Sequence, residues 1–150
     1  MQSLESVLRL VIETRTFSNA LRRVIISSMR IYTSALIAAL AVYFFNKPGL
    51  EGLYVNVWWY DIFMHILGGF SVGLLLSLIS SAVFKDRPLS PYKIILGTLV
   101  FGLGWEFLEV YFNVTGHPIG SSAYYLDTAK DILDDIIGSS VAVYIFKKLL

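Results

Sequence analysis

Seven ionisable side chains interrupt the apolar stretches of this sequence. They are Asp61, His65, Glu106, Glu109, Asp131, Asp134 and Asp135. Within each stretch these residues are three or four positions apart, and residues at that spacing lie on one face of a helix. An ionisable group in a membrane helix costs about 2.5–3.5 kcal/mol on insertion scales, so a function or a partner must compensate for it. The spacing therefore predicts a shared polar site where three helices meet.

Carboxylates and one imidazole, without thiolates, are ligands suited to Mg, Mn, Ca or Zn ions. Six carboxylates beside a neutral imidazole repel one another unless they are protonated or neutralised by a cation. The first hypothesis is therefore a divalent metal site, with Glu106, Glu109, Asp131 and Asp135 as ligands. His65 would be a further ligand or a general base, and Asp61 would orient it.

Two other interpretations explain the same residues. Chains of intramembrane carboxylates commonly conduct protons or cations, which predicts a small transporter acting as a homo-oligomer. Alternatively, the side chains only hydrogen-bond to one another and to the backbone at a wet outer rim. This structural reading applies most to Asp61, one turn into its helix, and to Asp134, which points about 100° away from Asp135.

The composition indicates a membrane protein. Apolar residues make up 56% of the chain and charged residues only 15%, against roughly 25% charged residues in soluble domains. The sequence has no cysteine, which excludes disulfides and thiolate metal sites. A net charge of +1 gives no sign of a nucleic-acid partner, and membrane lipids are the partners that the composition favours.

Four stretches approach the roughly 20 apolar residues that a membrane span requires. They cover about 29–45, 57–84, 93–112 and 128–146. Four crossings place ten of the twelve Lys and Arg residues on the side of both termini, which predicts that the termini are cytoplasmic. The loops 46–56 and 113–127 would then face outward.

Residues 1–28 are too charged to span a membrane. Leu4, Val7, Leu8, Val11 and Ile12 follow the spacing of one helix face. We therefore expect a cytoplasmic amphipathic helix on the membrane surface, or two short helices divided near residues 16–19. A soluble helix packed on the inner end of the bundle is the alternative. The predicted fold is all-α: an integral membrane four-helix bundle over 29–150, with this N-terminal amphipathic region.

Helix geometry predicts the depth of the cluster. At about 1.5 Å per residue, Glu106 lies roughly 20 Å beyond Lys93, and Asp135 lies roughly 18 Å from Lys147. The acids should therefore gather in the outer half of a hydrocarbon layer about 30 Å thick. Glycines on or near the same faces should let the helix backbones approach closely. These are Gly68, Gly69, Gly102 and Gly138.

Three motifs carry a resemblance to a known family. They are Asp61-x3-His65-x3-Gly69-Phe70, then Trp105-Glu106-x2-Glu109, then Asp127-Thr128-x2-Asp131-x3-Asp135-x2-Gly138. Over about residues 57–147 the chain resembles the YjdF-like family of small polytopic membrane proteins of bacteria and archaea. More distantly it resembles the VanZ-like family, which has Gln and Asn where this chain has Glu109 and Asp135. The resemblance implies a multi-pass protein of a prokaryotic plasma membrane, and it implies no particular reaction.

The first hypothesis, stated in full, is a divalent-metal site that binds or acts on an envelope lipid headgroup. The alternatives are a proton- or cation-coupled small transporter and a non-catalytic membrane scaffold. The sequence lacks a Walker-type glycine loop, which excludes NTPase chemistry of that kind. Hydrolysis, transport and plain binding are all compatible with the remaining residues.

Overall fold

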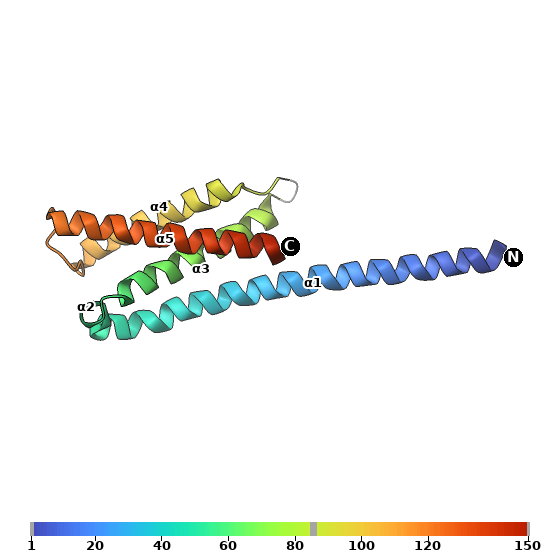
Figure 1. The fold of residues 1–150 in the computed structure, drawn as a ribbon, viewed down its shortest axis with the longest axis horizontal. Coiled ribbons are helices and arrows are strands. Elements are labelled where there is room, and N and C mark those ends of the chain that lie inside the picture. The colour runs from blue at the N-terminus through green and yellow to red at the C-terminus, as the bar shows by residue number, and fades with distance from the viewer. Residues whose placement is uncertain (1, 85–86, 150) are drawn as a thin grey trace.

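A computed structural model of the protein describes residues 2–84 and 87–149, which form helices and connecting turns without a strand. The four long helices are α1 (Gln2–Pro48), α3 (Tyr60–Val83), α4 (Pro91–Phe112) and α5 (Ser122–Leu149). A π-helical turn, η1 (Gly49–Leu53), and the short helix α2 (Tyr54–Asn56) connect α1 to α3 (Figure 1). The predicted all-α class is therefore confirmed.

Three segments are long and apolar enough to cross a membrane: Ser28–Leu53, α3 and α4. They correspond to the first three predicted spans. Helix α5 contains the predicted fourth span but carries too many charged residues to qualify by composition. Its 28 residues would nevertheless extend roughly 42 Å, which exceeds the hydrocarbon thickness of about 30 Å. A fourth crossing therefore stays a prediction.

The N-terminal region differs from the expectation of a separate surface helix. Helix α1 is continuous from Gln2 to Pro48, so the chain does not break at residues 16–19, and the segment before Ser28 extends beyond the other helices (Figure 1). The Thr16 hydroxyl donates a hydrogen bond to the Ile12 carbonyl oxygen, as an isolated polar residue does within a helix. A distinct amphipathic helix is not confirmed. The side chains of Leu4 and Val7, from its expected apolar face, lie outside the described residues. Residues 85 and 86, just after the second predicted span, also lie outside them.

Glycines determine how closely α3 and α5 pack. A Cβ atom on Gly69 would collide with the backbone of Asp135, and one on Gly138 would collide with the backbone of Ile66. The two helices can therefore approach only where both lack side chains, as the sequence predicted for these two positions. Helix α4 packs against both α3 and α5, whereas α1 lies mainly along α3.

The interior of the bundle is divided along its length. An apolar core lies in the half nearest the C-terminus and consists of Ile31, Leu74, Leu78, Ala142 and Phe146. The opposite half lies near the α1–α3 and α4–α5 connections, at the left of Figure 1. The first turns of α3 and the last turn of α4 lie in this half, and so do the buried charged residues of the bundle. The fold thus separates a closed apolar half from a polar half.

Local signals fix the helix ends that border the polar half. Helix α4 ends at Asn113, whose left-handed backbone (φ 62°) is tolerated better by Asn than by most residues. The N–H of Val114 then donates to the Glu109 carbonyl oxygen, which closes the last turn. The start of α3 is tied to α1, because the Tyr60 hydroxyl donates to the Phe45 carbonyl oxygen.

Candidate metal centre

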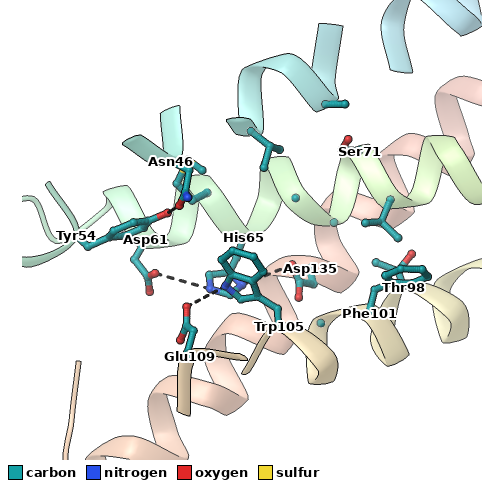
Figure 2. Close-up of a pocket in the computed structure, with 17 residues that line it drawn as sticks. Asn46, Tyr54, Asp61, His65, Ser71, Thr98, Phe101, Trp105, Glu109 and Asp135 are labelled. Carbon is teal, nitrogen blue, oxygen red and sulfur yellow. Dashed lines mark hydrogen bonds and ion pairs between the residues drawn. The ribbon is translucent and has the colours of Figure 1, made fainter. Parts of the chain in front are cut away.

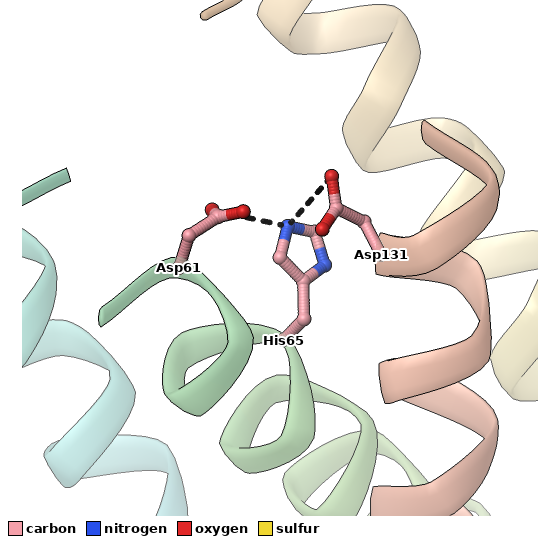
Figure 3. A group of neighbouring side chains, drawn as sticks. All are labelled: Asp61, His65 and Asp131. Carbon is pink, nitrogen blue, oxygen red and sulfur yellow. Dashed lines mark ion pairs between the residues drawn. The ribbon is translucent and has the colours of Figure 1, made fainter. Parts of the chain in front are cut away.

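His65 lies at the centre of the polar half. Its exposed fraction is 7%, and three carboxylates from two helices surround its ring. Nε2 is 3.7 Å from Asp61 Oδ1 and 3.9 Å from Asp131 Oδ2, as Figure 3 shows. Nδ1 is 3.5 Å from Asp135 Oδ1 on the opposite side of the ring. The predicted convergence of the motifs on α3 and α5 is therefore present.

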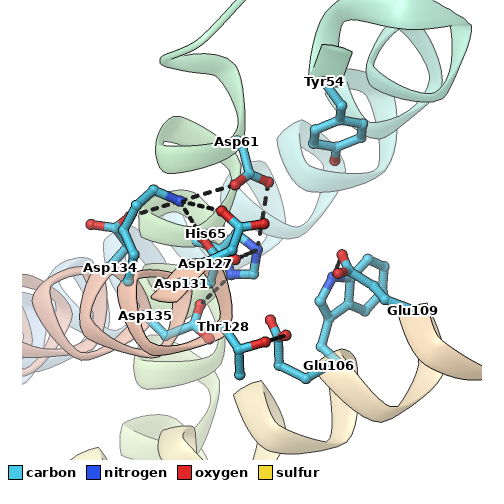
Figure 4. A network of polar contacts seen from close by, with 12 residues as sticks. Tyr54, Asp61, His65, Glu106, Glu109, Asp127, Thr128, Asp131, Asp134 and Asp135 are labelled. Carbon is cyan, nitrogen blue, oxygen red and sulfur yellow. Dashed lines mark hydrogen bonds and ion pairs between the residues drawn. The ribbon is translucent and has the colours of Figure 1, made fainter. Parts of the chain in front are cut away.

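Lys130 has a larger part in the cluster than the sequence suggested. Its ammonium nitrogen is 3.1 Å from Asp61 Oδ2 and also donates to Asp131 Oδ1. It lies 3.7 Å from Asp127 Oδ1 and 4.0 Å from Asp134 Oδ2 (Figure 4). Helical spacing was the sequence signal for these ion pairs, because Asp127 lies three residues before Lys130 and Asp134 lies four residues after it. The Lys130 ammonium group is therefore the positive charge that Asp61 of α3 shares with three acids of α5, which are Asp127, Asp131 and Asp134.

Helix α4 contributes two carboxylates of different character. Glu106 has an exposed fraction of 7%, and its Oε2 accepts a hydrogen bond of 2.7 Å from the Thr128 hydroxyl. Its other oxygen, Oε1, is buried and has no hydrogen-bond partner. In Figure 4 the Glu106 side chain reaches toward α5 and His65. Glu109 is partly buried and accepts a hydrogen bond of 2.9 Å from the Trp105 indole N–H.

Among the described residues, Asp61, His65 and Asp131 form a group with metal-ligand potential, because one ligand atom from each lies within 4.8 Å of the other two. Neighbouring ligands of a tetrahedral ion with bonds of about 2.1 Å are roughly 3.4 Å apart, so small movements would suffice. Two of the expected ligands, His65 and Asp131, belong to this group. Asp61 supplies the third ligand atom, and the other expected ligands lie outside the group. These are Glu106, Glu109 and Asp135.

A cavity of about 310 Å³ lies beside this group, between α1, α3 and α4. One end is polar, with Asp61, His65, Glu109 and Asp135 around it (Figure 2). Sequence reasoning did not predict the cavity, because its walls come from helices far apart in the chain.

Tyr54 and Asn46 complete the polar end of the cavity and join α1 to the turn that follows it. The Tyr54 hydroxyl donates a hydrogen bond of 2.9 Å to Asn46 Oδ1. Burial raises the pKa of the Tyr54 phenol above its ordinary value, and the negative charge of Asp61 raises it further. The phenol therefore keeps its proton and serves as a hydrogen-bond donor at this edge of the site.

Three apolar helices and a charged cluster buried between helices define a multi-pass membrane protein. Residues 10–150 match the family model described as predicted membrane protein (DUF2238), and the chain belongs to this family. The match agrees with the YjdF-like resemblance and gives no support to the VanZ-like one. No curated protein and no solved structure matches the chain.

Proposed function

We propose that this protein crosses a prokaryotic plasma membrane four times and binds a divalent cation at Asp61, His65 and Asp131. In this proposal the cation site lies toward the outer face of the membrane, with both termini in the cytoplasm. There it holds, or acts on, the polar headgroup of an envelope lipid. The observation that carries the proposal is the buried imidazole whose Nε2 faces carboxylates from two different helices.

The exposed surface of α5 supports a fourth crossing. Its outward side chains are apolar at Leu133, Ile137, Val141 and Tyr144, which are spaced as one helix face. The acids of the same helix are turned inward and buried, at Asp131, Asp134 and Asp135. A helix with this distribution presents an apolar surface to lipid even though its composition is charged.

Charge balance supports a bound cation. Seven carboxyl groups of the described cluster surround Lys130 and a single imidazole, so negative charge remains in excess even if His65 is protonated. These are Asp61, Glu106, Glu109, Asp127, Asp131, Asp134 and Asp135. The buried Oε1 of Glu106 has no hydrogen-bond partner and carries a desolvation cost that a proton or a nearby cation would offset, although Glu106 lies outside the proposed ligand group.

The two ring nitrogens of His65 suit two different roles. Nε2 would bind the cation with Asp61 and Asp131, while Nδ1 faces Asp135 at 3.5 Å. A carboxylate beside the second nitrogen of a ligating histidine fixes the ring orientation and increases its basicity. We therefore assign Asp135 an orienting role and Asp61 a ligand role, the reverse of the assignment made from spacing. A cation held there would attract phosphate oxygens or activate a water molecule.

The apolar core favours a one-sided site over a pathway through the membrane. The polar residues occupy the half of the bundle near the α4–α5 connection, and Leu74, Ala142 and Phe146 fill the other half. Ser77 and Thr98, also buried, donate to carbonyl oxygens of their own helices, and the buried Ser139 hydroxyl has no hydrogen-bond partner, so these three side chains do not form a hydrogen-bonded chain. A transporter would need the core to open, whereas a binding site needs no such motion.

The test is the metal content of the protein purified in detergent. We expect about one equivalent of a divalent ion in the parent, measured by elemental analysis, and its loss in the double variant Asp61→Asn/Asp131→Asn. Asp134→Asn is the matched control, because Asp134 is a buried acid of the same helix outside the proposed ligand set. Circular dichroism would verify that each variant is folded.

Two results would contradict the proposal. One is a parent protein that binds no divalent ion when Mg, Mn, Ca and Zn salts are titrated in turn. The other is equal metal content in the parent and the double variant. If both variants lost stability but the parent bound no ion, the cluster would act only as a scaffold that locks α3 to α5.

A further inference from the structure

The cavity beside the cation group opens on the flank of the molecule between α1 and α4. Phe101 and Trp105 both line it, yet their exposed fractions are 57% and 45%, so the wall they form reaches the surface. Both residues lie on α4, which is apolar enough to span a membrane. An opening there would face lipid, so a molecule with an apolar chain could enter from the bilayer.

The two ends of the cavity differ in chemistry. The end away from the carboxylates is mostly apolar, with Ala39, Val42, Val72 and Phe101 beside the hydroxyl residues Ser71 and Thr98 (Figure 2). Its polar end has the three carboxylates of Asp61, Glu109 and Asp135 beside the single imidazole of His65, and none of the described lining residues is Lys or Arg. Lys130 faces the other side of Asp61 and Asp131 and does not line the cavity. The polar end is therefore suited to a positive charge.

Aromatic rings stand beside these carboxylates. Trp105 lines the cavity and donates its indole N–H to Glu109, which fixes the ring next to the acid (Figure 2). Tyr54 lines the same end. Indole and phenol faces attract ammonium groups, and proteins that recognise such cations combine aromatic faces with carboxylates. The volume of about 310 Å³ lies at the lower limit for small-molecule sites, about 300–1,000 Å³, which suits one chain and one small head.

We propose that this cavity binds an amphiphile with a single apolar chain, whose protonated amine lies against Trp105 and Glu109. The chain would extend past Phe101 toward Val42 and Val72. A simple alkylamine and an aminophospholipid with one acyl chain both carry such an amine, and the recognition chemistry is the same for the two. This inference rests on the proposed function for its lipid setting and names the class of headgroup involved.

Trp105 provides a direct reporter. The chain has three tryptophans, and replacing Trp58 and Trp59 by Phe leaves Trp105 as the remaining one. The protein in a neutral detergent is titrated with dodecylamine and dodecanol, then with lysophosphatidylethanolamine and lysophosphatidylglycerol of equal chain length. We expect each amine to change the Trp105 fluorescence at a concentration about tenfold lower than its amine-free counterpart, as a charge-assisted contact in a desolvated site allows.

Three variants locate the effect. Glu109→Gln should remove most of the preference for the amine, whereas Glu51→Gln, which changes an exposed acid outside the cavity, should retain it. Val42→Phe fills the apolar end and should weaken binding of dodecylamine and dodecanol alike. Equal responses to amine and alcohol in the parent, or a preference that Glu109→Gln leaves intact, would overturn the inference.

The metal content of Glu109→Gln separates this inference from the proposed function. We expect it to equal that of the parent, because Glu109 lies outside the cation group. If lysophosphatidylglycerol bound more tightly than the amine, and only with a divalent ion added, the amine site would be rejected while the cation site stood. Amine preference in a protein that binds no divalent ion would reject the cation site alone.

Discussion

At the scale of single residues, Lys130 decides how the acids of the cluster coexist. It reaches from α5 to Asp61 on α3 while also contacting Asp131, so two members of the proposed cation group share one ammonium group. A divalent ion at that group would compete with Lys130 or share the same carboxylates. Lysine and cation are therefore expected to be thermodynamically coupled.

Lys130→Met tests this coupling. Removing one partner of a buried ion pair typically costs 3–5 kcal/mol, and partial exposure of the lysine reduces our expectation to about 1–3 kcal/mol of stability. Because the carboxylates are then freed, a divalent ion should raise the Tm of Lys130→Met more than that of the parent. Thermal unfolding in detergent, with and without the ion, measures both effects.

Lys130→Arg is the control, since it retains the charge and should behave nearly as the parent. A Lys130→Met variant with the parent's Tm and no response to divalent ions would show that the lysine and the cation group are independent. That result would weaken the charge-balance argument for a bound ion.

At the scale of helices, the contact between α3 and α5 determines the register of the site. Gly69 on α3 meets the backbone of Asp135, and Gly138 on α5 meets the backbone of Ile66. His65 lies one turn from Gly69, and Asp135 lies one turn from Gly138. The same close approach that joins the helices therefore sets the distance between the imidazole and the carboxylates of α5.

Gly69→Ala should separate the two helices. The added Cβ would collide with backbone atoms of Asp135, which cannot rotate away, so we expect destabilisation of about 1–3 kcal/mol or more. Metal content should fall with it, because His65 and Asp131 would move apart. Thermal unfolding and elemental analysis of the same preparation measure the two consequences.

Gly104→Ala is the matched control within a helix. A Cβ at Gly104 would meet no atom within 4 Å, so the change should be neutral or stabilising by up to about 1 kcal/mol. Equal effects of the two substitutions would mean that glycine's helix propensity, and not the close approach of α3 and α5, explains any change in stability.

At the scale of the whole molecule, consecutive long helices run in opposite directions (Figure 1). The charged cluster lies in the half of the bundle that contains the first turns of α3. With four crossings, the connection before α5 and the end of α5 lie on opposite sides of the membrane. With three, they lie on the same side. The side of the membrane on which the end of α5 lies depends on this difference.

Single cysteines distinguish the two topologies, because the natural chain has none. Ile119→Cys should react with a membrane-impermeant maleimide in intact cells, whereas Arg87→Cys and Lys147→Cys should react only after the membrane is opened. All three positions are exposed. If Lys147→Cys labelled from the same side as Ile119→Cys, α5 would not cross the membrane.

Much of this arrangement was determined by local sequence. Four apolar stretches near 29–45, 57–84, 93–112 and 128–146 predicted where the long helices lie, because each approaches the roughly 20 apolar residues of a membrane span. Helical spacing placed Asp61 with His65, and Asp131 with Asp135, on common faces. The identities of most cluster residues followed, since a charge within an apolar helix is costly enough to require a partner.

Only the tertiary structure decided which of those groups meet. The pairing of Lys130 with Asp61, the sharing of His65 Nε2 by Asp61 and Asp131, and the cavity at Trp105 all join residues from different helices. Local sequence also did not predict that α1 is continuous. The polar residues near 16–19 suggested a break, but the Thr16 hydroxyl forms its hydrogen bond within the helix. Periodicity defines the face of a helix, but the depth and rotation at which two faces meet depend on close contacts such as those of Gly69 and Gly138.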